Sequence, residues 1–388
     1  MVCFLFWKAG LIFTYFWKGI NRKTMDMKKP TLVVDLKRVE LNIKRMVDKF
    51  KRKGVQFRPH FKTHQSRFIG EVYRQKGITR CTVSSVGMAQ YFAKAGWNDI
   101  TIAFPANTLE ADEMNSLAED MQLQILVDTV EKVEFFTSNI STNIGLFIEI
   151  DTGYNRSGIL FDRREEIENI IRAIEAVPQF SFKGFLSHTG NTYSQLSSND
   201  IIALFDDSRR KLVDLKNHFT ENYPQIILSM GDTPAASLAK NFEGIDEMRP
   251  GNFVFYDVMQ YLLGSCSIDD IAVAVYCPVV AKYPERNQIV IYGGGVHLSK
   301  EKIFWNEKDI YGLVSLPDQY GFGRILSDSY VESFSQEHGI VKMSSTEINK
   351  IQLGDILAVL PVHSCMTVDL NREMISLYGK SISKFRTY

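Results

Sequence analysis

A lysine that could act as a nucleophile lies between two histidines in the sequence His60-Phe61-Lys62-Thr63-His64. This segment directly follows the short apolar run 55–59, and Arg58 lies four residues before the lysine. We expect the neighbouring cations to lower the pKa of Lys62, because they disfavour its charged form. A neutral amine can add to a carbonyl group, so Lys62 is a candidate Schiff-base lysine. The alternative is an ordinary surface lysine whose alkyl chain lies along the rim of the protein.

Two later segments carry small and polar residues that could bind a phosphate group: Gly231 and Thr233 in the first, Gly251 and Asn252 in the second. A helix predicted at 235–240 begins just behind the first segment, so a phosphate could lie at its positive end. Each segment alone could be an ordinary turn. Opposite a Schiff-base lysine, the two together suggest pyridoxal phosphate as the cofactor.

The segment Pro361-Val362-His363-Ser364-Cys365 carries a possible metal-binding pair. We predict a strand here, and residues i and i+2 of a strand point to the same side. An imidazole and a thiolate that point together are suitable for zinc, and two protein ligands leave positions open for water or substrate. A His-x-Cys motif alone more often marks a packed histidine and a buried free cysteine. The metal interpretation therefore depends on the lysine and phosphate signals.

Eight short apolar runs alternate with segments of helical periodicity and could position these residues. The runs are 55–59, 81–85, 100–104, 123–127, 144–150, 182–187, 226–230 and 246–250. Eight βα units over roughly 200 residues predict a (β/α)₈ TIM barrel, although a doubly wound sheet would use the same alternation. In a barrel, chemistry lies on the loops after the carboxyl ends of the strands. Lys62 and the polar clusters at 151–156, 188–193, 231–234 and 249–252 would then lie on one rim.

The sequence divides into three parts. Residues 28–270 carry the barrel pattern, and strand-like segments separated by turns predict an all-β domain over 271–388. Residues 1–27 are strongly apolar, with only positive charges before Asp26. They could be a membrane anchor, a dispensable leader from a spurious start upstream of Met25 or Met27, or ordered structure. We exclude them from the fold prediction.

The composition excludes several classes of protein. The 388 residues include 45 Lys+Arg and 45 Asp+Glu, so the net charge is zero and no global field attracts nucleic acid or an anionic membrane. A hydrophobic fraction of 45% excludes a disordered chain. Five cysteines are too few for a disulfide framework, so we expect a reducing, cytoplasmic location.

Five segments resemble the motifs of the D-threonine aldolase and D-serine dehydratase family, which are fold-type III pyridoxal-phosphate enzymes related to alanine racemase. The segments are RPHFKTHQS (58–66), DTGYNRSGI (151–159), SHTGNTY (187–193), EMRPGNFVFYD (247–257) and PVHSC (361–365). The resemblance covers about residues 30–388. It implies an alanine-racemase-like barrel and a β domain into which the residues just before the barrel also pack. It also implies pyridoxal 5'-phosphate and Zn²⁺, or another divalent metal, as cofactors.

The resemblance also implies roles for individual residues. Lys62 would be the Schiff-base lysine, Arg156 would contact the phenolic oxygen of the cofactor, and Tyr193 would be a second catalytic residue beside it. His363 and Cys365 correspond to the metal pair of the family. The other cofactor-binding residues that the resemblance implies are His188, Gly231, Asp232, Thr233, Gly251, Asn252 and Tyr256. The chain departs from the family pattern at Gln65, commonly lysine, and at Met88, frequently acidic, which leaves the choice of substrate open.

The implied activity is that of a lyase acting on D-3-hydroxy amino acids. Dehydration would convert D-serine to pyruvate and ammonia, whereas aldol cleavage would convert D-threonine to glycine and acetaldehyde. The thiolate ligand slightly favours the dehydratase. The alternatives are a racemase that uses Tyr292, Tyr311 or Tyr320 as its second acid or base, and a non-catalytic pyridoxal-phosphate carrier. We expect a small D-amino acid as the partner molecule, a homodimer by resemblance, and neither nucleic acid nor a membrane as a partner.

Overall fold

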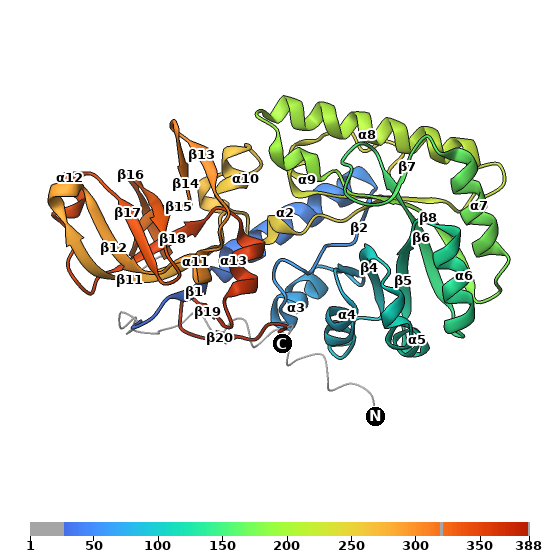
Figure 1. Cartoon of the computed structure of the whole chain (residues 1–388), viewed down its shortest axis with the longest axis horizontal. Coiled ribbons are helices and arrows are strands. Elements are labelled where there is room, and N and C mark those ends of the chain that lie inside the picture. The colour runs from blue at the N-terminus through green and yellow to red at the C-terminus, as the bar shows by residue number, and fades with distance from the viewer. Residues whose placement is uncertain (1–26, 319–320, 387–388) are drawn as a thin grey trace.

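Eight parallel strands form a barrel in the computed structural model, which describes residues 27–318 and 321–386 (Figure 1). The spatial order is β2-β10-β9-β8-β6-β5-β4-β3, and a bridge between His60 and Thr82 joins the two ends. The strands are β2 (Gln56–Phe57), β3 (Cys81–Val83), β4 (Asp99–Pro105), β5 (Gln122–Val127), β6 (Ile144–Asp151), β8 (Phe180–Ser187), β9 (Ile227–Met230) and β10 (Glu247–Met248). Each overlaps one of the eight predicted runs. The barrel is therefore confirmed, and the open doubly wound sheet is excluded.

Amphipathic helices cover the outside of this barrel. In α7 the isoleucines at 167, 170, 171 and 174 are buried at helical spacing, so one face packs on the strands. These helices are α2 (Leu36–Lys53), α3 (Arg67–Gln75), α4 (Val86–Ala93), α5 (Ala111–Asp120), α6 (Val130–Asn139), α7 (Arg164–Glu175), α8 (Ser198–Phe219) and α9 (Thr233–Leu238). The short helix α10 (Val258–Leu262) follows the barrel strands and lies beside the β domain (Figure 1). Short 3₁₀ turns lie at Thr108–Glu110, Gly190–Ser194, Asn252–Val254 and Ile268–Asp270, and β7 (Ile159–Leu160) pairs with the end of β6.

A second sheet forms the β domain, in the order β12-β17-β16-β15-β18-β11-β1-β19-β20. Because β12 also pairs with β11, its first six strands close into a small antiparallel barrel. The strands are β1 (Thr31–Val34), β11 (Val273–Tyr283), β12 (Gln288–Tyr292), β15 (Gly312–Asp318), β16 (Gly321–Phe334), β17 (His338–Lys342), β18 (Ile356–Pro361), β19 (Met374–Ser376) and β20 (Ser381–Ile382). A separate two-stranded sheet is formed by the hairpin of β13 (Ile303–Trp305) and β14 (Lys308–Ile310). A 3₁₀ turn covers Pro284–Arg286.

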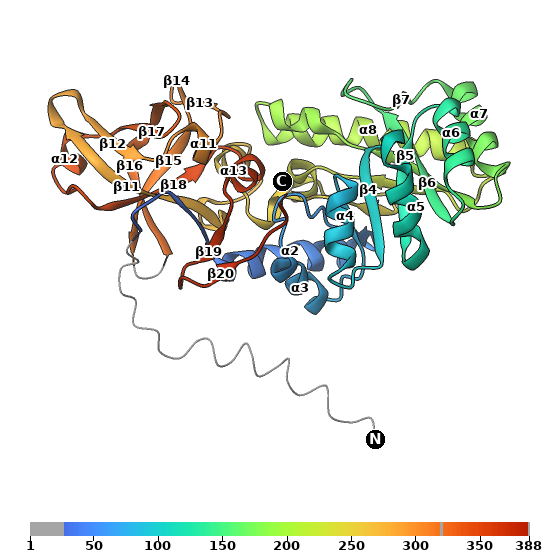
Figure 2. The ribbon, with the colours of Figure 1, turned by 60° about the horizontal axis from the view of Figure 1, so that its bottom comes forward.

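The β domain differs from the all-β prediction in two respects. It contains three short helices: α11 (Gly295–Leu298), α12 (Ser345–Ile348) and α13 (Ser364–Leu370). It also includes β1, which lies before the barrel in the sequence and pairs with both β11 and β19, as the family resemblance implied. The two parts lie side by side, and α13 faces the barrel (Figure 2). Most of the predicted leader, residues 1–26, lies outside the described residues.

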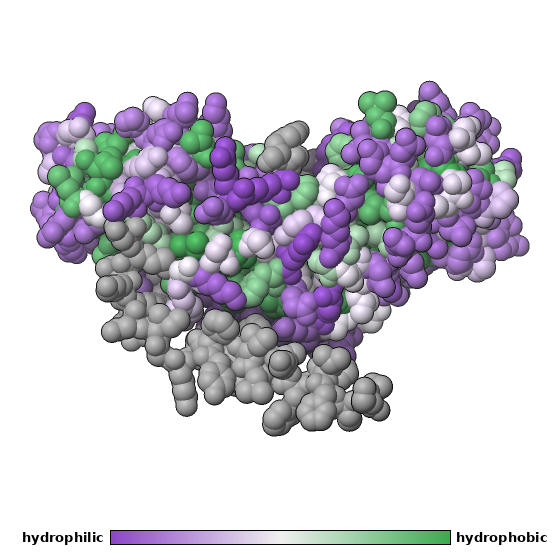
Figure 3. Space-filling model, turned by 90° about the horizontal axis from the view of Figure 1, so that it is seen from below, coloured by the Kyte–Doolittle hydropathy of each residue, from purple (hydrophilic) through white to green (hydrophobic). Residues whose placement is uncertain are grey.

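The surface shown in Figure 3 is mainly hydrophilic over both parts, with apolar residues in separated patches. The large apolar side chains are instead concentrated in one continuous core that extends from the barrel into the β domain. Within residues 27–318 and 321–386, no helix is both long and apolar enough to cross a lipid bilayer.

A buried chain of polar contacts crosses the barrel interior. Arg58 donates from Nε to Glu247 Oε2 at 2.7 Å and from Nη1 to Asp99 Oδ1 at 2.6 Å. The other oxygen of Glu247 accepts a hydrogen bond from Ser229 Oγ at 2.7 Å, and Ser229 Oγ in turn accepts one from Arg249 Nε at 2.7 Å. This chain links residues of β4, β9 and β10 with the segments that follow β2 and β10.

We predict that Arg58→Met destabilises the protein by about 3–5 kcal/mol, because it leaves the buried Glu247 carboxylate without one of its charged partners. The measurement is the free energy of unfolding from urea titration. Arg172→Met is the matched control, since Arg172 forms an exposed pair with Glu168 that contributes about 0–1 kcal/mol. Equal losses in the two variants would contradict the prediction.

Candidate active site

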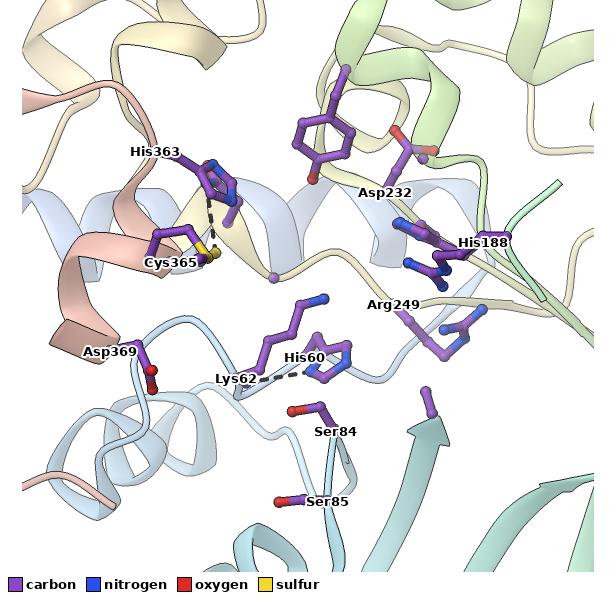
Figure 4. A pocket seen from close by; sticks show the side chains of 18 of the residues that line it. His60, Lys62, Ser84, Ser85, His188, Asp232, Arg249, His363, Cys365 and Asp369 are labelled. Carbon is purple, nitrogen blue, oxygen red and sulfur yellow. Dashed lines mark hydrogen bonds between the residues drawn. The ribbon is translucent and has the colours of Figure 1, made fainter. Parts of the chain in front are cut away.

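A cavity of about 700 Å³ lies where the carboxyl ends of the barrel strands face the β domain (Figure 4). Residues from the loops after β2, β6, β8, β9 and β10 line it, together with residues of α13. Ten of the twelve predicted site residues lie in its wall: Lys62, Arg156, His188, Tyr193, Gly231, Asp232, Gly251, Asn252, His363 and Cys365. The remaining two, Thr233 and Tyr256, do not line it.

Local packing directs Lys62 into the cavity. The preceding Phe61 is fully buried, and its ring packs against those of Phe92 and Trp97 with centroid distances of 4.9 and 4.8 Å. His64 is buried in the same aromatic cluster. Because Phe61 and His64 are anchored in the core, the side chain of Lys62 points away from the core and into the cavity. The backbone N–H of Lys62 donates a hydrogen bond to His60 Nδ1 at 3.3 Å.

The surroundings of Lys62 favour its neutral form. Burial lowers its pKa, and the charges of Arg156 and Arg249 lower it further, whereas a Cys365 thiolate opposes them. The prediction that the neighbouring Arg58 and histidines supply the positive charges that lower the pKa of Lys62 was partly wrong. Arg58 is bound to Asp99 and Glu247, and burial lowers the pKa of His64 to about 3, so this histidine is neutral. The lowered pKa therefore depends on burial and on arginines that are distant in the sequence.

The two glycine turns of the predicted phosphate site pack closely against neighbouring backbone. A Cβ on Gly231 would lie 2.7 Å from Arg249 N, and a Cβ on Gly251 would lie 2.9 Å from His60 O. No other residue fits either position without a shift of the backbone. These narrow turns, a lysine amine with a lowered pKa and a positive charge at Arg249 form a site that fits pyridoxal phosphate.

Asp232 lines the cavity, and its carboxylate is also bound within the protein. It is the N-cap of α9, and its Oδ1 accepts hydrogen bonds from Ala235 N at 2.7 Å and Thr192 Oγ1 at 3.0 Å. Its Oδ2 accepts one from Thr189 Oγ1. Burial raises the pKa of Asp232 to about 6. The carboxylate therefore fixes the 189–192 loop to α9, which starts at Thr233, two residues earlier than predicted.

Thr233 and Tyr256 bind within the protein. The Thr233 hydroxyl accepts a hydrogen bond from Phe253 N at 3.2 Å, which joins the two glycine turns. The Tyr256 hydroxyl lies 3.2 Å from Ser237 Oγ, within hydrogen-bond distance. Both side chains therefore support the wall of the cavity from behind.

His188 and Tyr193 lie beside the cavity in defined protonation states. Burial lowers the pKa of His188 to about 3, and its Nδ1 lies 2.5 Å from Gly231 O. Only a protonated nitrogen can donate to a carbonyl, so Nδ1 carries the proton of the neutral ring. Burial raises the pKa of Tyr193, whose hydroxyl accepts from Thr233 N at 3.3 Å. Its ring meets the His363 ring edge-on, with centroids 6.4 Å apart.

The predicted metal pair lies at a helix start, not on a strand. Strand β18 ends at Pro361, His363 is the N-cap of α13, and Cys365 lies in its first turn. The strand prediction was wrong because Asp257, which is distant in the sequence, accepts a hydrogen bond from Ser364 N at 2.9 Å and so supports the start of the helix. His363 and Cys365 nevertheless both line the cavity.

The chemistry of this pair fits a metal ion. Burial alone would raise the pKa of the Cys365 thiol, but His363 and Lys62 outweigh it and lower the pKa. His363 Nδ1 lies 3.3 Å from Asp257 Oδ2, an arrangement typical of metal-binding histidines. Nowhere among the described residues do three or more His, Cys, Asp or Glu side chains form a metal-binding group. Two protein ligands fit a catalytic metal that also binds water or substrate.

Several cavity residues were not among the predicted catalytic, cofactor-binding and metal-binding residues. His60, Arg249 and Asp369 line the cavity, and Asp257 lies behind His363. Arg249 and Asp257 belong to the segment 247–257 that carries the family resemblance, so their motif was a usable signal. Nothing in the local sequence marks Asp369, because its position depends on where α13 lies relative to the barrel.

The closed parallel barrel carries a lysine on its rim, and the β domain that faces it supplies an imidazole and a thiolate. This arrangement defines an alanine-racemase-like barrel enzyme. Residues 34–258 match the family described as alanine racemase, N-terminal domain, and the chain belongs to that family. Residues 272–377 match a second family, described as a putative serine dehydratase domain. The resemblance found in the sequence is thereby confirmed.

Relatives of known activity match nearly the whole chain. D-serine dehydratase of Dictyostelium discoideum is 28% identical over 376 residues, which cover 89% of this chain and 92% of that protein. D-threo-3-hydroxyaspartate dehydratase of Delftia sp. (strain HT23) is 27% identical over 355 residues, covering 88% and 92%. The solved structure of the Delftia enzyme superimposes with a TM-score of 0.85 at 25% identity, covering 93% of this chain and 98% of that one.

We predict that Asp257→Asn lowers the affinity of the pair for Zn²⁺ by about 10- to 100-fold, because His363 loses its charged partner. The substitution also removes the oxygen that accepts hydrogen bonds from Asn252 Nδ2 and Ser364 N, which support the start of α13. Asparagine can still cap α10 by accepting the hydrogen bond from Gln260 N. The measurement is competition for zinc with a chromophoric chelator. Asp269→Asn is the control, since Asp269 is exposed. Unchanged zinc affinity in Asp257→Asn would contradict the assigned role.

We also predict that Arg156→Gln raises the pKa of Lys62, because it removes one of the charges that disfavour the ammonium form. In cofactor-free protein, labelling of Lys62 by an amine reagent requires the neutral amine. The midpoint of its pH dependence should therefore lie below that of an ordinary lysine and move upward in the variant. Peptide mass spectrometry measures the labelling. Arg163→Gln is the control on an exposed arginine, and an unmoved midpoint in Arg156→Gln would count against the prediction.

Proposed function

We propose that this protein is a pyridoxal-phosphate-dependent lyase that removes the β-hydroxyl group of D-3-hydroxy amino acids and converts D-serine to pyruvate and ammonia. The proposal is carried by one observation. A lysine amine with a lowered pKa shares a cavity with an imidazole–thiolate pair contributed by the other part of the chain. The two relatives above, both named dehydratases, support the same activity.

The barrel side of the cavity would hold the cofactor. When bound, pyridoxal phosphate supplies an electron-withdrawing ring that stabilises negative charge at the substrate Cα. Lys62 would bind its aldehyde carbon, Arg156 its phenolic oxygen, and the turns at Gly231 and Gly251 its phosphate. The neutral amine of Lys62 is also the group suited to accept the proton from Cα.

Two fixed residues complete the barrel side. Arg249 donates from Nη2 to Ser187 O at 2.7 Å, so its positive charge is held in place beneath the cavity. Neutral His188 binds Gly231 O and holds the first glycine turn against the end of β8. Neither side chain must move for the cavity to accept a ligand, so the barrel side is preorganised.

The β-domain side would act on the hydroxyl group. A divalent metal held by His363 and Cys365 would act as a Lewis acid on that group, so that it can leave when the Cα proton is removed. A cysteine-to-alanine variant of a D-threo-3-hydroxyaspartate dehydratase was solved in a metal-free form, which supports a metal bound through a cysteine in that enzyme. We assign the same role to Cys365.

The other candidate activities have less support. Aldol cleavage would use the same two groups, with loss of the hydroxyl proton in place of the whole hydroxyl group. For racemisation, Tyr292 and Tyr311 do not line the cavity, and Tyr320 lies outside the described residues. A non-catalytic carrier would not need the β domain that supplies His363 and Cys365. The comparisons support a lyase over a racemase.

The remaining expectations concern location and assembly. The four cysteines within the described residues form no disulfide, which supports the cytoplasmic location that we propose. The homodimer implied by the family resemblance stays a prediction.

Lys62→Ala is expected to retain no pyridoxal phosphate after gel filtration and to lose at least about 10²–10⁴-fold of the pyruvate formation from D-serine. Lys44→Ala, which alters an exposed lysine of α2, is the control. Treatment of the wild-type enzyme with a chelator should abolish pyruvate formation, and Zn²⁺ should restore it. Retention of the cofactor by Lys62→Ala would overturn the cofactor role, and activity insensitive to chelation would overturn the metal role.

A further inference from the structure

Positive charges lie on only one side of the cavity, the barrel side, which also contributes the carboxylates Glu149 and Asp232 to the wall. The lining residues from the β domain are Glu301, His363, Cys365, Met366, Asp369 and Phe385. This set contains two carboxylates and neither a lysine nor an arginine. The lysine and arginines of the wall, Lys62, Arg156 and Arg249, all come from the barrel. Figure 4 shows Arg249 and His188 on one side of Lys62, and Cys365 and Asp369 on the other.

Asp369 is fixed on the side of the metal pair. It follows Cys365 by four residues in α13, so both side chains lie on one face of the helix. Its Oδ1 accepts a hydrogen bond from Gln65 Nε2 at 2.9 Å. Gln65 is buried, lies three residues after Lys62, and has a positive φ of 52°. The carboxylate is therefore held between α13 and the loop that carries the lysine.

Lys384, a cation of the β domain, lies close to Asp369, but its ammonium group is bound outside the cavity wall. Lys384 donates from Nζ to Val368 O at 2.7 Å, to Asp369 O at 3.2 Å and to Gln65 Oε1 at 3.3 Å. It does not line the cavity. The next residue, Phe385, does, and its ring packs against Tyr91 with centroids 5.6 Å apart. The C-terminal segment thus adds an apolar side chain, not a positive charge, to this wall.

From this arrangement we propose that Asp369 excludes substrates with a second carboxylate and restricts the enzyme to D-3-hydroxy amino acids with an uncharged β-substituent, such as D-serine. The inference rests on the proposed function and narrows its substrate class. A hydroxyl group at the His363–Cys365 pair places the β-substituent on the side of Asp369. A β-carboxylate there meets the like charge of Asp369, and the β-domain wall supplies no arginine or lysine to offset it. A metal held by the pair would already be engaged by the hydroxyl group, so this juxtaposition disfavours binding.

The test compares D-serine with D-threo-3-hydroxyaspartate in the holoenzyme, with ammonia release as the common assay. Wild type should favour D-serine in kcat/KM. Asp369→Asn, which keeps an oxygen acceptor for Gln65, should raise the relative kcat/KM for hydroxyaspartate by at least about tenfold, mainly through KM. Glu373→Gln removes a negative charge from an exposed residue near the end of α13 and should leave the ratio unchanged.

Equilibrium binding gives a readout that does not depend on turnover. D-alanine and D-aspartate lack the β-hydroxyl group, so calorimetry can measure their affinities for the holoenzyme without elimination. The comparison is repeated after removal of the metal by a chelator, which excludes binding of the β-carboxylate of D-aspartate to the metal. Wild type should bind D-alanine more tightly than D-aspartate. Asp369→Asn should reduce the ratio of these two affinities by at least about tenfold, the factor expected for kcat/KM. High salt should also narrow it in the wild type, because Asp369 is accessible to solvent.

The outcomes separate the two proposals. Preference of the wild type for hydroxyaspartate, or an unchanged substrate ratio in Asp369→Asn, overturns the role of Asp369 and leaves the lyase intact. Activity on neither substrate overturns the proposed function, and the D-alanine to D-aspartate binding ratio then still decides the role of Asp369.

Discussion

The buried carboxylate of Glu247 is the point on which the barrel and its site depend. It is 2% exposed, it accepts hydrogen bonds from Arg58 and Ser229, and Ser229 carries the contact on to Arg249. A buried charge is tolerated only when it is paired and hydrogen-bonded. The same contacts that satisfy Glu247 therefore align the barrel strands and place the charge of Arg249 beside the cavity, where it helps to lower the pKa of Lys62.

Asp257 has a comparable role between the two parts of the chain. Its buried carboxylate accepts hydrogen bonds from Asn252 Nδ2 at 2.6 Å and from Ser364 N at 2.9 Å, and it lies beside His363. One group thus joins the second glycine turn of the barrel, the start of α13 and the metal pair. Hydrogen bonds within the protein therefore fix the position of the metal side relative to the cofactor side before any ligand binds.

The fold could be predicted from the sequence where burial of a strand or helix determines its pattern of apolar residues. Parallel strands are covered on both faces, so most of the barrel strands appear as apolar runs. The two-residue strand β10, in which the buried Glu247 precedes Met248, carries no such run. Strand β16 carries no clear alternation of apolar and polar residues, because it contains many polar residues and pairs in irregular register with β15 and β17. His363 was placed on a strand because its helix start is supported by Asp257, a long-range contact without a local signal. Likewise, the sequence could not show that Arg58 is bound to Glu247 and that Arg156 and Arg249 are the arginines that act on Lys62.

The position of β1 has a consequence for how the protein is synthesised. This strand leaves the ribosome among the first described residues, yet it pairs with β11 and β19, for example Leu32 with Val275 and Met374. The whole barrel is translated before either partner exists, so β1 must remain unpaired throughout that time. Contacts this distant in the sequence slow folding and leave an open strand edge exposed to other chains. The β domain is therefore not an independent folding unit, and the nascent chain has its greatest need for chaperone protection while the barrel is being made.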